Sequence, residues 1–250
     1  MTVSADTPSE QDLRDRLAAC AVALIGCGGL GSNAAAMLLR SGVRTLTLID
    51  FDVVEESNLN RQLYFRDQLG RLKTEALRDT LLRIDPGATL TLVPERVTKD
   101  NLIGFVRGAD LIIEAVDTAE TKAMIVNLCM SALPDTPVVT ASGLAGYASA
   151  NDIVTERPCD DLYLVGDLTS DVSTGLPLFA SRVMVAAAHE AHAASLSRRS
   201  CSDGLSALTV TRPRPAGRSP VCHRREGPIP PAHAGCSRKR CGGCREAGGR

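Results

Sequence analysis

The chain has 250 residues, of which 44% are hydrophobic and 3% aromatic, and its formal net charge is −1. This length allows one large domain with an aliphatic core, or one domain with an appendage. No stretch approaches the roughly 20 consecutive apolar residues of a membrane span, and the polar N-terminus is unlike a secretory signal. We therefore expect a cytoplasmic protein without a membrane partner.

Short β-branched runs alternate with amphipathic stretches between residues 21 and 141, which is typical of βαβ units and a parallel sheet. The pattern predicts strands at 22–25, 45–49, 89–93, 111–115 and 138–141. It predicts helices at 32–40, 74–84, 101–105, 119–130 and 180–196, and a polar loop over 152–174. The expected fold class is α/β, with a Rossmann-like, mainly parallel sheet flanked by helices.

A glycine-rich turn, Gly26-Cys27-Gly28-Gly29-Leu30-Gly31, directly follows the first predicted strand and opens a helix. Gly26 permits the tight turn, Gly28 lets the backbone approach a phosphate, and Gly31 lets helix and strand pack closely. The helix N-terminus attracts the anion. Asp50 ends the second predicted strand, where a carboxylate can bind both ribose hydroxyls. These features fit NAD and ATP equally.

The next segment, residues 50–65, distinguishes the two nucleotides. It adds a second carboxylate and two polar pairs, which are Asp52, Ser57–Asn58 and Arg61–Gln62. A dehydrogenase has no need for these groups just beyond the ribose. Each charge alone would suit a solvated loop, but a triphosphate carries more negative charge than a dinucleotide, so Arg61 and Lys73 are suited to its oxygens. The segment favours ATP.

Six motifs together resemble the E1-like adenylating family of ThiF, MoeB and HesA, most closely its short ThiF branch. They are GCGGLGSN, DFDVVEESNLNRQ, GRLKTEAL, RIDP, EAVDTAETKAMI and ASGLAGYASAN. The resemblance implies that Gly28 lies against the ATP phosphates and that Asp50 holds the ribose. It also implies phosphate contacts from Asn58, Arg61 and Lys73. The predicted nucleotide site comprises Gly26, Gly28, Gly29, Gly31, Asp50, Asp52, Asn58, Arg61, Gln62 and Lys73.

Asp117 ends the EAVD motif at a predicted strand end, where a carboxylate points into the ligand crevice of a parallel sheet. The resemblance implies that Asp117 holds Mg²⁺ near the α-phosphate. Asp117 could also cap the helix predicted to begin at residue 119, and the two roles are compatible. Arg61, Lys73 and Asp117 are the predicted catalytic residues.

The implied reaction is attack by the C-terminal glycine carboxylate of a ThiS-like, ubiquitin-like sulfur carrier ending in Gly-Gly on the α-phosphate of ATP, in thiamine thiazole biosynthesis. A carboxylate is already nucleophilic at neutral pH, so alignment and charge neutralisation suffice. Activation of a MoaD-type carrier or of a tRNA-linked carbamoyl group, as by TcdA-like enzymes, is an alternative within the family. An NAD-dependent oxidoreductase and a binding module without activity are alternatives outside it.

The family also implies a homodimer, whereas a nucleic-acid partner is not expected because the chain before residue 198 is not basic. Cys159 stands where longer members have a first CxxC pair, but its +3 neighbour is Leu162, so no complete zinc site is expected. Related short members carry a loop cysteine where this chain has Val165, and we expect Cys159, the nearest thiol, to be inert. Arg14 and Arg16 are candidates for the arginine that the family lends to the neighbouring subunit.

Residues 198–250 differ in composition, with 12 Lys and Arg against 3 Asp and Glu, which leaves 16 and 26 before them. This Pro-, Gly- and Arg-rich tail lacks a periodic apolar pattern, which predicts disorder. It could be a basic arm, a zinc knot of Cys241 and Cys244 with Cys222, His233 or Cys236, or a non-native extension. With a single CxxC, the extension is favoured. The predicted organisation is a 1–17 segment, an 18–197 adenylation domain and a 198–250 tail.

Overall fold

The computed structural model describes residues 9–170 and 175–196, all within the first of two units into which the chain divides, Met1–Thr209. Its strands are β1 (Ala21–Ile25), β2 (Thr45–Ile49), β3 (Thr89–Val93), β4 (Leu111–Glu114), β5 (Val138–Ala141), β6 (Val154–Cys159) and β7 (Leu162–Gly166). Its α-helices are α1 (Glu10–Ala19), α2 (Gly29–Ser41), α3 (Lys73–Leu82), α4 (Leu102–Val106), α5 (Ala119–Ala132) and α6 (Ala180–Leu196). Three short 3-10 helices are η1 (Glu56–Asn58), η2 (Arg66–Gln68) and η3 (Ala150–Asp152).

The seven strands form one sheet in the order β3-β2-β1-β4-β5-β7-β6. Every neighbouring pair is parallel except β6 and β7, which form an antiparallel hairpin. From β1 the chain adds β2 and β3 on one side of the sheet, and it then returns to add β4, β5, β7 and β6 on the other side. The strand order therefore reverses between β1 and β4. This is the switch point at which doubly wound sheets form their ligand crevice.

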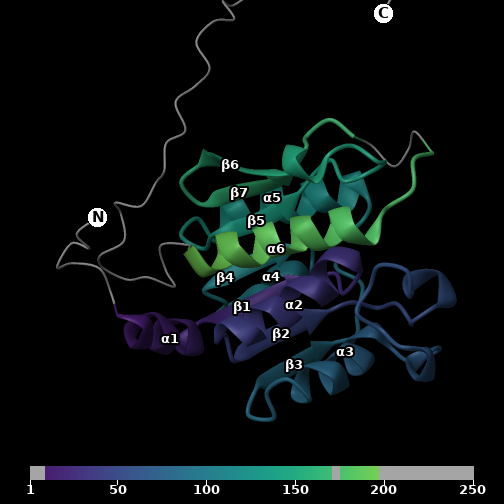
Figure 1. Ribbon diagram of the computed structural model, residues 1–250. Helices are drawn as coiled ribbons and strands as arrows, with labels where there is room; N and C mark the ends of the chain where they lie inside the picture. The colour runs from purple at the N-terminus through teal and green to yellow at the C-terminus, as the bar shows by residue number, and fades with distance from the viewer. Residues whose placement is uncertain (1–8, 171–174, 197–250) are drawn as a thin grey trace, which may run out of the picture. The chain divides into compact units, whose positions relative to one another are not determined.

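Helices cover both faces of the sheet (Figure 1). Alternate residues of β1 pack against different helices on these two faces. Val22 and Leu24 join a core cluster with α2, α3 and α6 residues, whereas Ala23 and Ile25 join a second cluster with α4 and α5. Side chains alternate between the faces of a strand, so a continuously apolar strand such as β1 is buried on both sides. The predicted α/β class is therefore correct.

The structure contains a hairpin and a helix that the sequence analysis did not predict. Residues 152–174 were expected to form a loop, but 154–166 form the β6–β7 hairpin. All six residues of β6 are exposed at the sheet edge, so no alternating apolar pattern marks this strand. Residues 10–19 form α1, which buries no residue fully and begins with a capping box at Ser9. This helix is specified by its cap rather than by an apolar face.

The other predicted elements agree with the structure to within a few residues. The helix expected at 32–40 begins at Gly29, and the helix expected over 180–196 has those bounds. No helix among residues 9–170 and 175–196 is long and apolar enough to cross a membrane. The tail at 198–250, with its predicted disorder and zinc knot, lies outside the described residues.

Candidate functional site

The carboxyl ends of β1, β2 and β4 meet at one level of the sheet. The Gly26 amide donates a hydrogen bond to the Ile49 carbonyl at 2.8 Å, and the Ala115 amide donates to the Ile25 carbonyl at 2.8 Å. The residues that leave these strands, the glycine loop after β1, Asp50 after β2 and the β4–α5 turn, are therefore neighbours. The sheet brings together three predicted parts of the site at its switch point.

The glycine loop is a tight turn whose shape depends on two positions. Gly26 has a φ of +95°, which disfavours other residues, and a Cβ atom there would lie 2.6 Å from the Ala115 carbonyl oxygen. A Cβ atom on Gly31 would lie 1.9 Å from the Gly26 carbonyl oxygen. Gly28 is the N-cap residue of α2, and no side chain caps this helix. The loop thus presents an uncapped helix N-terminus, a favourable position for an anion.

Asp50 is 8% exposed and turns its carboxylate toward the loop. Its oxygens accept hydrogen bonds from the Cys27 amide at 2.6 Å and the Asp52 amide at 2.8 Å. Burial raises the pKa of Asp50, against these amides and the charge of Lys73, which lower it. Asp50 therefore shapes the glycine loop, while a bond to ribose stays a prediction for its remaining lone pairs.

The segment after η1 is fastened to α2. The Asn33 side-chain amide donates to the Arg61 carbonyl at 3.0 Å, and the Ser32 hydroxyl accepts from the Leu63 amide at 3.0 Å. These bonds bring the Arg61 side chain to 3.5 Å from a Cβ atom built on Gly29. The structure thereby unites the glycine loop with Arg61. Ser32 and Asn33 were not among the predicted site residues, although both lie in the GCGGLGSN motif.

Gln62 faces the same loop. Its Nε2 lies 3.9 Å from a Cβ atom built on Gly28, with no other heavy atom nearer to that position. Its Oε1 is buried and has no hydrogen-bond partner among the described residues. A buried polar atom without a partner costs free energy, which a ligand donor or a water can recover. The loop therefore has both open space and an unused polar group beside it.

Lys73 begins α3 and reaches the same corner. Its Nζ lies 2.8 Å from Asp52 Oδ2, and the two side chains are 8% and 47% exposed. The Tyr64 hydroxyl donates to the Cys27 carbonyl at 2.7 Å and lies 3.4 Å from the Lys73 carbonyl, which ties α3 to the glycine loop. Lys73 is thus a largely buried cation paired with a half-exposed carboxylate.

Asn58 and Arg61 also make bonds within their own segment. Asn58 is 8% exposed, and its Oδ1 accepts from the Glu55 amide at 3.0 Å. Arg61 Nη1 donates to the Ser57 carbonyl at 3.2 Å and to Asn60 Oδ1 at 2.8 Å. Asn58 therefore shapes the η1 turn, and the Arg61 guanidinium keeps other donors for a ligand, since it has five N–H groups.

Asp117 is exposed and lies on the β4–α5 turn. The N-cap residue of α5 is Thr118, so the suggested helix-capping role of Asp117 is wrong by one position. No group of three or more His, Cys, Asp and Glu among the described residues could hold a metal ion. Mg²⁺ commonly binds through one or two carboxylates together with substrate phosphates, and Asp117 beside the loop fits that donor set.

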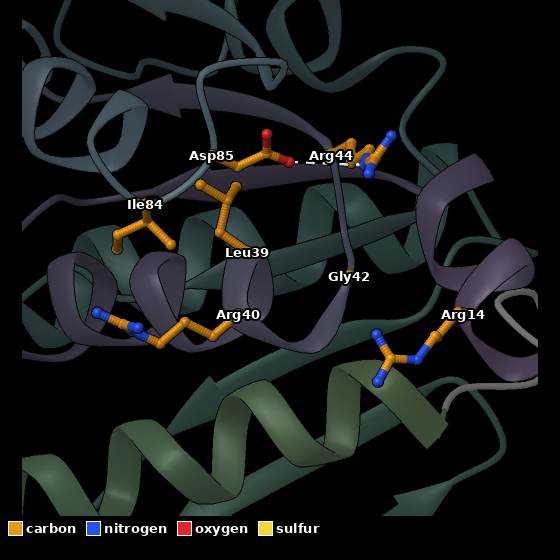
Figure 2. Close-up of a pocket in the computed structure, with 7 residues that line it drawn as sticks. All are labelled: Arg14, Leu39, Arg40, Gly42, Arg44, Ile84 and Asp85. Atoms are coloured by element: carbon orange, nitrogen blue, oxygen red, sulfur yellow. Dashed lines mark ion pairs between the residues drawn. The ribbon is translucent and has the colours of Figure 1, made fainter. Parts of the chain in front are cut away.

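A shallow hollow of about 430 Å³ lies away from this corner (Figure 2). Its lining residues are Arg14, Leu39, Arg40, Gly42, Arg44, Ile84 and Asp85. They flank the end of α2 and the start of β2, at the amino edge of the strands, and the guanidinium groups point in different directions. Arg14, one candidate for the lent arginine, pairs here with Glu10 at 2.7 Å.

Cys159 was considered above for zinc binding and for sulfur chemistry. It is exposed at the end of β6 and is a free thiol. The antiparallel pairing places it opposite Leu162 of β7. This position lies on the outer edge of the sheet, four strands away from β1 in the sheet order.

Comparison with known proteins identifies relatives whose sequences are similar to this chain. A tRNA threonylcarbamoyladenosine dehydratase of Escherichia coli is 34% identical over 134 residues, 53% of this chain and 49% of that protein. A sulfur carrier protein ThiS adenylyltransferase of E. coli is 35% identical over 134 residues, 53% of each protein. The chain thus matches about half the length of both.

The solved structure of the E. coli dehydratase TcdA in complex with ATP is also similar, with a TM-score of 0.64 and 25% identity. The superposition covers 73% of this chain and 88% of TcdA. The sequence model described as the ThiF family matches residues 5–173, which include the glycine loop, the segment with Arg61 and Lys73, and the β4–α5 turn. The chain belongs to the ThiF family.

Proposed function

We propose that this chain catalyses ATP-dependent adenylation of the C-terminal glycine carboxylate of a ubiquitin-like sulfur carrier, of the ThiS type used in thiamine thiazole biosynthesis. The observation that carries the proposal is the convergence of the uncapped α2 N-terminus with Arg61, Gln62 and Lys73. Family membership, a relative named as a ThiS adenylyltransferase and the ATP complex of TcdA support it.

The geometry suits a triphosphate at the helix N-terminus. Gly28 leaves open space beside the loop, and the Gln62 Nε2 donor faces that space. Lys73 pairs with Asp52, whose carboxylate is half exposed, so water screens this ion pair. A phosphate group, which carries more negative charge, can therefore replace Asp52 as the partner of Lys73. In this arrangement the phosphates lie along the loop and the ribose lies toward Asp50.

The reaction needs positioning more than proton transfer. A carboxylate oxygen of the carrier attacks the α-phosphorus of ATP, the bond from that phosphorus to the bridging oxygen breaks, and pyrophosphate leaves with the electron pair. No proton moves in this step. Arg61 and Lys73 neutralise the charge that develops on the phosphate oxygens, a form of stabilisation that is strong in a partly buried site.

Mg²⁺ bound beside Asp117 would add charge neutralisation at the phosphates. The homodimeric state and the cytoplasmic location remain predictions from the sequence.

A second candidate function is activation of a tRNA-linked carboxylate. The E. coli tRNA threonylcarbamoyladenosine dehydratase matches this chain about as well as the ThiS adenylyltransferase does. The excess of acidic over basic residues before position 198 disfavours RNA as the partner. We therefore rank the sulfur carrier first.

The test is carrier-dependent exchange of labelled pyrophosphate into ATP. We expect Arg61→Ala and Lys73→Ala to lower the exchange rate by about 10²- to 10³-fold, as loss of one stabilising group does, with an unchanged circular dichroism spectrum. Arg71→Ala is the matched control, because Arg71 pairs with Asp79 at the surface, and it should change the rate less than about twofold.

The outcomes separate the candidates. Exchange with a ThiS-type but not a MoaD-type carrier supports the proposed substrate, and the reverse replaces it. Exchange with tRNA alone supports the second candidate, whereas NAD binding without exchange points to an oxidoreductase. Wild-type rates in folded Arg61→Ala and Lys73→Ala proteins contradict the proposed site.

A further inference from the structure

Glu114 is a charged residue at the centre of the fold. It is the last residue of β4, lies between β1 and β5, and is 0% exposed. A carboxylate in such a place is costly unless donors surround it. Within the part of the chain that the structure describes, its hydrogen bonds and ion pair are with Val116, Lys122 and Thr140, so the predicted site residues do not explain its presence.

Three donors from three elements converge on this carboxylate. Its Oε1 accepts from the Val116 amide at 2.8 Å, and its oxygens lie 3.0 and 2.7 Å from Lys122 Nζ. The Thr140 hydroxyl of β5, directly across the strand pair, donates to Oε2. The side chain therefore links β4, β5 and the first turns of α5.

The bond to the Val116 amide determines what this network does. Val116 directly precedes Asp117, and the same turn lies against the glycine loop, since a Cβ atom on Gly26 would lie 2.6 Å from the Ala115 carbonyl oxygen. An apolar side chain would fill the core here at less desolvation cost, but it could not accept from a backbone amide. The carboxylate thus specifies the shape of the turn.

We propose that Glu114 is a positioning residue for adenylation: it fixes the β4–α5 turn, and with it Asp117, against the glycine loop that receives the phosphates. This inference rests on the proposed function. Glu114 itself touches neither substrate, and its effect passes through the Val116 amide. Its contribution should therefore appear in the catalytic step rather than in ATP binding.

The chain supplies a matched control in Glu190 of α6. Glu190 is also 0% exposed, and its two oxygens have no hydrogen-bond partner among the described residues. Burial raises the pKa of Glu190, with Lys122 lowering it and Glu114 raising it further. Glu190→Gln therefore replaces a carboxyl group that is as fully buried as that of Glu114, without removing a hydrogen bond to the β4–α5 turn.

The first measurement is hydrogen exchange of the Val116 amide by NMR on the full chain. In Glu114→Gln one acceptor oxygen must serve three donors, so we expect Val116 to exchange at least about fivefold faster than in wild type, and no such change in Glu190→Gln. Thr140→Val keeps the ion pair but removes the hydroxyl that orients Oε2. The carboxylate is then held less firmly beside the Val116 amide, so this variant should also exchange faster and serves as the test if Glu114→Gln does not fold.

The second measurement is pyrophosphate exchange. We expect Glu114→Gln to lower kcat about 10-fold with the KM for ATP changed less than about twofold. In an Asp117→Ala background it should have less than a twofold further effect, because both changes disturb one turn. An increase in KM alone, or additive losses, would overturn the proposal.

Failure of the two proposals is distinguishable. If wild type shows no exchange with any carrier, the proposed function fails, while the Val116 exchange rates still report whether Glu114 fixes the turn. If wild type is active and Glu114→Gln leaves both Val116 protection and kcat unchanged, the positioning role is wrong and the function stands.

Discussion

The glycine corner, formed by residues 26–31 with Asp50, and the junction of β7 with α6 hold their loops in different ways. At the corner, Gly26 and Gly31 leave no room for a side chain, and Asp50 and Ser32 bind backbone amides. At the junction, a buried ion pair does this work. Arg182 Nη2 lies 2.6 Å from Asp167 Oδ2, both side chains are under 7% exposed, and Nη1 donates to the Ser149 carbonyl at 3.0 Å.

The difference shows which cations a ligand can use. Arg182 is enclosed together with its partner, so releasing it would leave a buried charge. Lys73 is equally buried, but its partner Asp52 is 47% exposed and can be resolvated when the ammonium turns to another anion. The exposure of the partner, rather than of the cation itself, separates an available positive charge from a structural one.

The largest effect should come from filling the glycine corner. Gly31→Ala places a Cβ atom 1.9 Å from the Gly26 carbonyl oxygen, a contact that only backbone movement relieves. We expect loss of several kcal/mol of unfolding free energy, or failure to fold, measured by urea denaturation.

Gly104→Ala is the control for that change. Gly104 lies within α4, and a Cβ atom there would meet nothing within 4 Å. Alanine should stabilise the helix by about 0.5 to 1 kcal/mol, since glycine loses more backbone entropy on folding. Equal behaviour of the two variants would show that the corner is not the constraint described above.

A second test breaks the junction. Asp167→Asn leaves Arg182 buried without a counter-charge, and we expect a loss of about 3 to 5 kcal/mol at pH 7 in urea denaturation. The control is Asp79→Asn, because the Arg71–Asp79 pair has the same 2.6 Å separation but is 39% and 40% exposed. It should cost less than about 1 kcal/mol.

The pH dependence sharpens this comparison. Burial raises the pKa of Asp167, but hydrogen bonds from the Ser170 and Thr169 amides outweigh it and lower the pKa from 3.8 to about 2. A lowered carboxyl pKa contributes stability above the unfolded value and loses it as pH falls. Wild type should therefore lose stability between about pH 4 and pH 2 through this group, and Asp167→Asn should show a shallower loss. Parallel pH profiles would contradict the assignment.

The smallest expected change tests the open side of the corner. A Cβ atom on Gly28 meets only Gln62 Nε2, at 3.9 Å, so Gly28→Ala should leave the unfolding free energy within about 1 kcal/mol of wild type. In the proposed complex the methyl group occupies space needed by the phosphates. We expect ATP affinity, measured by calorimetry, to fall about 10-fold. Unchanged affinity would place the nucleotide elsewhere.

The sequence predicted the parallel sheet and the corner because each leaves a local mark. Buried strands such as β1 are apolar runs, and the glycines stand at fixed spacing between a strand and a helix. Asp52 could be assigned to this corner because it closely follows a predicted strand, and Lys73 because its GRLKTEAL motif resembles that of the family. The ion pair between Lys73 and Asp52, and the hydrogen bonds from backbone amides to Asp50, could not be predicted. They depend on side-chain positions in the folded chain, which the spacing of residues along the sequence does not determine.

The hairpin and the Glu114 network could not be predicted in the same way. The residues of β6 are all exposed, so this strand exists through pairing with β7 and not through an apolar pattern. Glu114 and Thr140 are 26 positions apart and become partners only when β4 and β5 align. Arg182 and Asp167, likewise, look like ordinary surface charges until α6 covers the sheet.

The edge strand β6 also protects the molecule from its own sheet. An open strand edge offers unpaired backbone groups to any passing chain and so invites aggregation. Here Pro158 lacks an amide hydrogen, Glu156 and Arg157 bring charge, and the register with β7 shifts between Glu156 and Cys159. These three features make β6 a poor template for a foreign strand, so the sheet can end here without offering a regular edge for pairing.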